Sequence, residues 1–175
     1  YCTRLALVDA ALRPCGLNPM PRRPLTIGNA LVENAAPGST IVVNRAARDL
    51  LAHATPSVTV MHDAWAYLVV SALGQIIYGP YPRILYRLHP SAAVGLDSTR
   101  LSRTIRIRRR SLNRYLADQL DQAQELQSLY GPRLSTRNQE ILGRFLSVRG
   151  RSSRERLAYA CHPDVFRQRT VDDLV

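Results

Sequence analysis

The amino-acid sequence predicts a mixed α/β fold over residues 1–96 and a helical tail over residues 97–175. Short apolar runs, separated by stretches of helical periodicity, carry the first prediction. A long segment with apolar residues at every third or fourth position carries the second. A chain of 175 residues, 46% of them apolar, is long enough to bury a core without disulfides or a structural metal.

The elements of the first part follow from local patterns. Residues 1–9 alternate and then run apolar, which predicts a buried strand ending at Asp9. Residues 12–26 are rich in proline, glycine and asparagine, which predicts a loop. The elements expected next are a short helix over Asn29–Asn34, a turn at Pro37–Gly38, a strand over Thr40–Val43 and a helix over Arg45–Ala54 capped by Asn44.

The nearly charge-free segment 58–89 contains the most informative residues. Asp63 is expected as the N-cap of a buried helix over Ala64–Leu73, because its carboxylate can accept hydrogen bonds from the N–H groups of the first turn. Gly74 is a natural end for this helix. Residues 75–89, "QIIY", "GPYP" and "RILYRLH", predict a strand, a turn and a second strand.

The tail is expected to be helical and amphipathic. One face of its first helix collects the apolar residues Leu112, Leu116, Leu120, Ala123, Leu126 and Tyr130. Two shorter helices are expected around Glu140–Leu146 and Ser153–Cys161, the second begun by a capping box of Ser152 and Glu155.

The net charge of +11 is concentrated in the tail, and all 24 basic residues are arginine. Residues 1–99 contain 8 Arg and 5 Asp or Glu, whereas residues 100–175 contain 16 Arg and 8 Asp or Glu. This excess indicates an anionic partner: a membrane surface, a nucleic acid or a phosphorylated ligand. Nucleic acid is the weakest of the three, because few aromatic residues stand between the arginines to stack on bases, and Arg106–Arg110 is typical of a solvated face.

Cys2, Cys15 and Cys161 lack the spacing of a zinc site or a disulfide framework, which favours free thiols in a reducing cytoplasm. The longest apolar stretch, Ala64–Leu73, is far shorter than the roughly 20 residues of a membrane span. The sequence begins with Tyr1 rather than Met and enters a strand at once, so we expect a fragment whose N-terminal part is missing.

Asp63 and His62 are the first candidates for chemistry. A carboxylate at the start of a buried helix can act as a general base when a substrate hydroxyl comes within hydrogen-bond reach, and it can equally be a plain helix cap. His62 fits a metal ligand, a substrate contact or a polar residue at the end of a strand.

Arg87 and His89 form a second pair, because strand alternation places both on one face. A guanidinium can hold a phosphate and an imidazole can bind a divalent metal, although metal ligands usually come in sets. The turn Pro37–Thr40 offers backbone N–H groups and hydroxyls to a ligand, or is simply a turn.

The order of these features resembles the second half of family-2 glycosyltransferases, and most closely the rhamnosyltransferase-like bacterial enzymes that build surface polysaccharides. The resemblance covers about residues 1–96. It rests on three motifs in sequence: Gly38-Ser39-Thr40, His62-Asp63 with Trp65, and Tyr86-Arg87-Leu88-His89.

The resemblance implies a GT-A fold, a Rossmann-like sandwich that transfers a sugar from a nucleotide-sugar donor with inversion. Asp63 would be the base that deprotonates the hydroxyl of a glycan or lipid-linked acceptor. Gly38, Ser39, Thr40, His62 and Trp65 would line the acceptor side. Arg87 would assist the donor diphosphate, and His89 would help to hold a divalent metal, Mn²⁺ or Mg²⁺, that neutralises the leaving group.

The sequence departs from the family pattern in two places. No Asp-x-Asp, the family's metal and donor motif, occurs in the 175 residues, and the nucleotide-binding half that precedes it is absent. The asparagine that often follows the histidine is also absent from "HPSAAVG". The sequence therefore predicts residues 1–96 to be the acceptor and catalytic-base half of a GT-A domain, with little turnover alone.

The basic amphipathic tail, 97–175, fits docking on the anionic inner face of the cytoplasmic membrane through residues 100–175. Two alternatives stay open: a non-catalytic remnant that binds a membrane or a partner through this tail, and an arginine-rich nucleic-acid binder.

Overall fold

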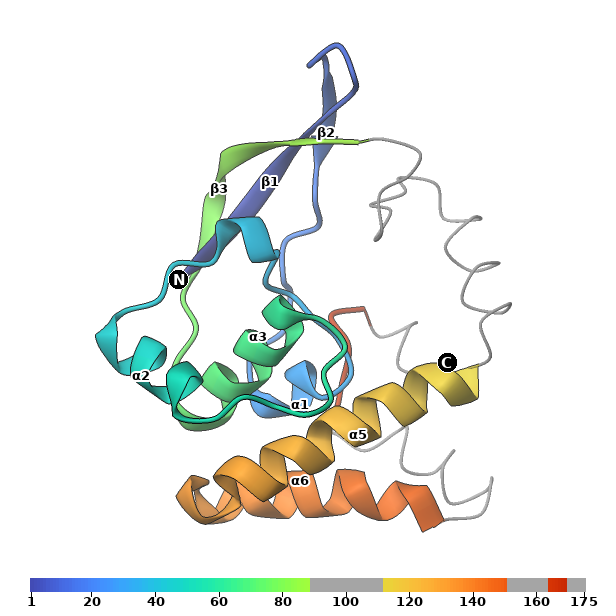
Figure 1. The fold of residues 1–175 in the computed structure, drawn as a ribbon. Coiled ribbons are helices and arrows are strands. Elements are labelled where there is room, and N and C mark those ends of the chain that lie inside the picture. The colour runs from blue at the N-terminus through green and yellow to red at the C-terminus, as the bar shows by residue number, and fades with distance from the viewer. Residues whose placement is uncertain (89–111, 151–163, 170–175) are drawn as a thin grey trace.

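The computed structural model describes residues 1–88, 112–150 and 164–169, and these form an α/β structure (Figure 1). A three-stranded sheet lies at one end and helices gather at the other. The strands are β1 (Cys2–Val8), β2 (Pro14–Leu17) and β3 (Tyr78–Arg87). The α-helices described are α1 (Ile27–Ala30), α2 (Arg45–His53), α3 (His62–Leu73), α5 (Leu112–Tyr130) and α6 (Thr136–Ser147). The short 3₁₀ turns are η1 (Gly38–Thr40), η2 (Gly131–Arg133) and η3 (Val148–Gly150).

The sheet is mixed, with β1 in the centre, antiparallel to β2 and parallel to β3. The expected first strand is confirmed. The loop expected over 12–26 is only partly correct, because β2 forms inside it along the edge of β1. Asn18 fixes this edge, since its Oδ1 accepts a hydrogen bond of 2.7 Å from the N–H of Leu5.

The hairpin expected over 75–89 is wrong. "QIIY" and "GPYP" do not turn back, and β3 runs as one strand beside β1 from Tyr78, which pairs with Cys2, to Arg87, which pairs with Val8. The register shifts along the way, between Thr3 and Leu5 of β1. Pro80 and Pro82 lie in that part of β3, and because proline has no N–H to donate, they explain an interruption of the ladder rather than a turn.

The first helices follow the sequence with one exception. Asn44 caps α2 as expected, its Oδ1 accepting from the N–H of Ala47 at 2.9 Å. α1 is shorter than expected and begins earlier. The strand expected over Thr40–Val43 is wrong, because η1 occupies its start. Only Val42 is held in a strand-like way, by two 2.8 Å backbone hydrogen bonds with Tyr1.

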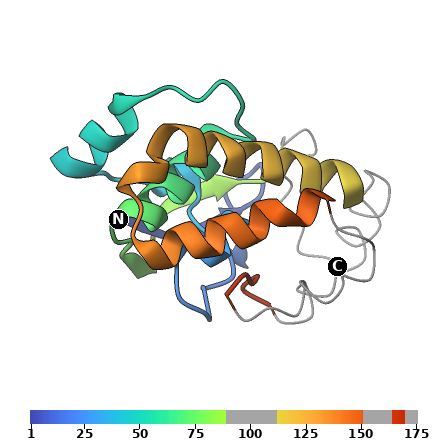
Figure 2. The same ribbon diagram turned by 90° about the horizontal axis from the view of Figure 1, so that it is seen from below.

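The amphipathic helix expected in the tail is confirmed as α5, which packs beside α6 (Figure 2). Its buried face joins α3 and α6 in one core, with the side chains of Leu68, Leu126, Tyr130, Leu142 and Phe145 all at most 2% exposed. The described residues of the first part and of the tail therefore share one hydrophobic core. The helix expected over Ser153–Cys161 lies outside the described residues.

Residues 164–169, the C-terminal clasp, return to the beginning of the fold and lie against α1. Asn29, fully buried, donates from Nδ2 to the carbonyl of Phe166 at 3.0 Å and accepts at Oδ1 from Nε2 of Gln168 at 3.1 Å. The guanidinium of Arg23 lies 3.9 Å from the ring centroid of Phe166. A Cβ on Gly28 would overlap the carbonyl of Asp164, so the clasp needs glycine at this position.

Candidate functional site

α3 begins at His62, so the expectation that Asp63 is its N-cap is wrong. The N-cap position belongs to Met61, which makes no side-chain hydrogen bond, and Asp63 lies inside the first turn. A carboxylate there is favoured by the partial positive charge of the helix N-terminus. The helix ends at Gly74 as expected, with the Gly74 N–H donating to the carbonyl of Val70.

Asp63 is held by backbone N–H groups on both oxygens and is only 6% exposed. Oδ2 accepts from the N–H of Gly38 at 3.1 Å, and Oδ1 accepts from the N–H of Ala64 at 2.9 Å. The next residue back, His62, is exposed, and its Nε2 would lie 3.2 Å from a Cβ built on Gly38. The structure thus brings together two motifs that stand 25 residues apart in the sequence.

The absence of a side chain on Gly38 is what permits this approach. A Cβ there would lie 3.0 Å from Oδ2 and 3.1 Å from Cβ of Asp63, tighter than nine in ten real contacts of a Cβ, so Asp63 would have to shift. Each carboxylate oxygen has two acceptor positions, so each keeps one after its backbone hydrogen bond. The arrangement therefore fixes the rotamer of Asp63 and leaves one acceptor position on each oxygen for a further donor, such as a hydroxyl.

Ser39 and Thr40 share the η1 turn but differ in environment. Ser39 is exposed, whereas Thr40 is 5% exposed. The Thr40 hydroxyl donates to the carbonyl of Pro37 at 2.9 Å and accepts from the N–H of Thr3 at 3.2 Å. Thr40 thus anchors the turn to β1, and Ser39 is the hydroxyl of the motif that reaches solvent.

Trp65 lies in the hydrophobic core. It is 5% exposed, and its ring centroid is 6.3 Å from that of Tyr130 of α5. Its indole N–H is the one buried side-chain polar group without a partner among the described residues.

Arg87 lies far from Asp63. It pairs with Val8, five residues along β1 from Thr3, and Thr3 is where the η1 turn touches the strand. At about 3.3 Å per residue this places Arg87 roughly 16 Å along the sheet from that contact. Arg87 is exposed at the end of β3, and His89 lies outside the described residues.

Several polar residues that sequence patterns did not single out hold the site in place. The buried Gln122 of α5 accepts at Oε1 from the N–H of Val60 and from the hydroxyl of Thr59, both at 3.1 Å. Glu125 accepts from the N–H of Ser57 at 3.0 Å. α5 therefore fixes the segment that leads into His62 and Asp63. The apolar pattern of the α5 sequence does not single out Gln122, and only the burial of its side chain in the structure reveals this role.

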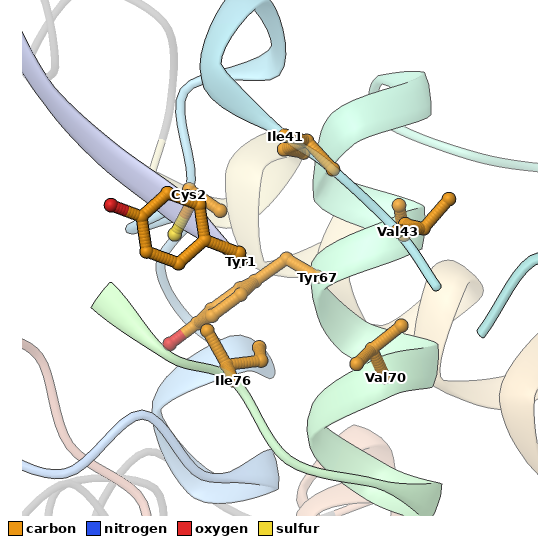
Figure 3. A pocket seen from close by; sticks show the side chains of 9 residues that line it. Tyr1, Cys2, Ile41, Val43, Tyr67, Val70 and Ile76 are labelled. Atoms are coloured by element: carbon orange, nitrogen blue, oxygen red, sulfur yellow. The ribbon is translucent and has the colours of Figure 1, made fainter. Parts of the chain in front are cut away.

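A small apolar pocket lies between α3 and the segment that follows η1 (Figure 3). Tyr1 lies at one side, Ile41 and Val43 follow the η1 turn, and Tyr67 and Val70 come from α3. Its volume is about 30 Å³. The Tyr67 hydroxyl donates to Oδ1 of Asn29 at 2.6 Å, and burial raises the pKa of this phenol.

The described part of the chain offers little support for the two expected partners, a divalent metal and a membrane surface. Among those residues no three His, Cys, Asp or Glu side chains converge as metal ligands. None of the described helices has the length and apolarity that crossing a membrane requires. The apolar face of α5 is buried in the core, so a membrane contact through the tail would rely on arginines. The cluster Arg106–Arg110 lies outside the described residues, and the membrane contact stays a prediction.

No family model matches the chain, and neither a curated protein nor a solved structure does.

Proposed function

We propose that this chain carries the acceptor side and the catalytic base of an inverting, rhamnosyltransferase-like glycosyltransferase of family 2 and GT-A type. The observation that supports it is the contact between Gly38 and Asp63, which joins two of the three motifs of the resemblance around one buried carboxylate. Both oxygens of Asp63 accept a backbone hydrogen bond, and each keeps a second acceptor position next to an exposed histidine and serine.

The chemistry asked of Asp63 is a proton transfer. Its carboxylate accepts the proton of an acceptor hydroxyl as that oxygen attacks the anomeric carbon of the donor, and the bond from that carbon to the diphosphate breaks. Two backbone N–H donors hold the carboxylate before substrate binds, so little reorganisation accompanies the step. The proposal gives the divalent metal only His89, and no step of the reaction is assigned to it.

The experiment uses the protein encoded by the complete reading frame that contains this chain. Release of nucleoside diphosphate from a panel of nucleotide-sugars is measured with glycan and lipid-linked acceptors. Asp63→Asn keeps the shape of the side chain but removes the base, so kcat should fall roughly 10²- to 10⁴-fold. Asp49→Asn is the matched control, because Asp49 is exposed and, within the part of the chain that the structure describes, pairs only with the neighbouring Arg48.

Two results would overturn the proposal. An undiminished kcat in Asp63→Asn would remove Asp63 from the reaction. The proposed transferase activity would also be contradicted if no donor released nucleoside diphosphate, or if release from every donor were the same with and without an acceptor.

A further inference from the structure

The two walls of the apolar pocket, α3 and the segment that follows η1, also carry Asp63 and Gly38 of the candidate site. Ala66, Tyr67 and Val70 follow Asp63 by three, four and seven positions on α3, which places all of them on one face of the helix. Val70 lies about 10 Å from Asp63 along the axis at 1.5 Å per residue. The opposite wall, from Gly38 to Val43, likewise begins at the carboxylate and ends at the pocket.

The lining determines the kind of group that fits. A buried water needs two to four polar partners, and the side chains around this pocket are almost all apolar. The hydroxyl of Tyr67 is already engaged with Asn29. An apolar group is therefore favoured over water or a hydroxyl.

The volume determines the size of the group. About 30 Å³ accommodates one or two water-sized groups, whereas a cavity that takes up benzene measures about 150 Å³. An aromatic ring or a long lipid chain does not fit. A methyl group does.

We propose that this pocket receives a methyl-sized apolar substituent of the acceptor, such as the methyl group of a deoxy sugar, while the neighbouring acceptor hydroxyl meets Asp63. The role of Asp63 toward the acceptor hydroxyl rests on the proposed function, whereas binding of the methyl group in the pocket requires no sugar transfer. Specificity for the acceptor then comes from Ile41, Val43 and Val70, and the reacting hydroxyl is selected by its distance from this anchor.

The test compares two probe sugars that differ only in this group: a 6-deoxyhexose methyl glycoside and the hexose glycoside with a hydroxymethyl group. Binding to the full chain is followed by NMR through the methyl signals of Ile41, Val43, Val70 and Ile76. We expect the deoxy sugar to shift these signals with a dissociation constant at least about tenfold lower, the usual scale for such a difference in an apolar pocket.

Two variants place the binding in the pocket. Ala66→Leu fills it and should remove the preference for the deoxy sugar, whereas Ala117→Leu, on the exposed side of α5, should leave it unchanged. Val70→Ala enlarges the pocket and should admit an ethyl group in place of the methyl, which keeps the test valid even if Ala66→Leu does not fold.

The outcomes separate the pocket from the enzyme. Equal binding of both sugars, or a preference that survives Ala66→Leu, overturns the pocket even where transfer is active. A preference that Ala66→Leu abolishes, together with no sugar transfer by the protein encoded by the complete reading frame, supports the pocket and overturns the proposed transferase.

Discussion

Leu126→Ala is expected to destabilise the whole described structure and not the tail alone. Leu126 is completely buried where α5 meets α3 and α6. Losing its outer three carbons removes roughly 2.4 kcal/mol of transfer free energy at about 0.8 kcal/mol per carbon. The cavity left behind adds to this, so the free energy of unfolding should fall by about 3–4 kcal/mol. For a chain of this length the melting temperature should fall by roughly 6–16 °C.

Trp65 makes the measurement specific. It is the only tryptophan in the sequence and lies buried on α3 against Tyr130 of α5, so its fluorescence reports on the junction between the two parts. Urea unfolding is followed by this fluorescence and by far-ultraviolet circular dichroism. In both the wild type and Leu126→Ala the two signals should change at one midpoint, which moves to lower urea in the variant.

The control is Leu85→Ala, at a side chain that is 64% exposed on β3, and it should change stability by less than about 0.5 kcal/mol. Two separate transitions, with the substitution moving only one of them, would show that the tail folds independently and would refute the argument for a shared core. A shift as small as that of Leu85→Ala would refute the calculated magnitude.

Three further outcomes are expected. Gly38→Ala should lower transfer at least about tenfold with a change in stability near 1 kcal/mol, because the new Cβ displaces the carboxylate of Asp63; an unchanged kcat would mean that the contact does not position it. Gln168→Ala should speed hydrogen exchange at the amides of Arg22 and Arg23, because Oε1 of Gln168 accepts from both N–H groups at 2.8 Å, whereas Gln124→Ala should not. Equal exchange rates in the two variants would contradict the contact between the clasp and this segment. The free energy of unfolding should fall as the pH rises above about 9. Burial raises the pKa of the Cys2 thiol above its ordinary 9.0 and the pKa values of the Tyr67, Tyr78 and Tyr130 phenols above 10.0, so the unfolded chain releases protons that the folded chain retains. A free energy of unfolding that stays constant to about pH 10.5 in urea titrations would contradict this.

The sequence predicted those elements whose signal is local. β1 is an apolar run, α5 has a regular apolar face and Asn44 is a favourable cap, so each is visible within a few residues. β2 was missed because proline and glycine argue against a strand, while the edge of β1 offers enough pairing to overrule them. β3 was divided in two for the same reason, at Pro80 and Pro82.

The candidate site was predictable only in its parts. The local sequence indicates a turn at Gly38 and a helix at Asp63, and the motif order of the resemblance assigns both residues to one site. The residues that flank each of them in the sequence do not show that the two are in contact. Asn29, Gln122 and Gln168 had no signal at all, since a polar side chain becomes a structural one only when distant segments bury it. Their partners lie on other elements, and no periodicity records that.

The clasp also determines which contacts can form early and which only late while the chain is being synthesised. Gln168 meets Asn29 across 139 residues, which a ribosome takes roughly 7–28 s to add at about 5–20 residues per second. Until then Asn29 lacks its hydrogen bonds to Phe166 and Gln168, although the Tyr67 hydroxyl can already donate to its Oδ1. The surroundings of α1 are therefore completed only when the clasp has been made, and contacts this distant in sequence favour slow folding.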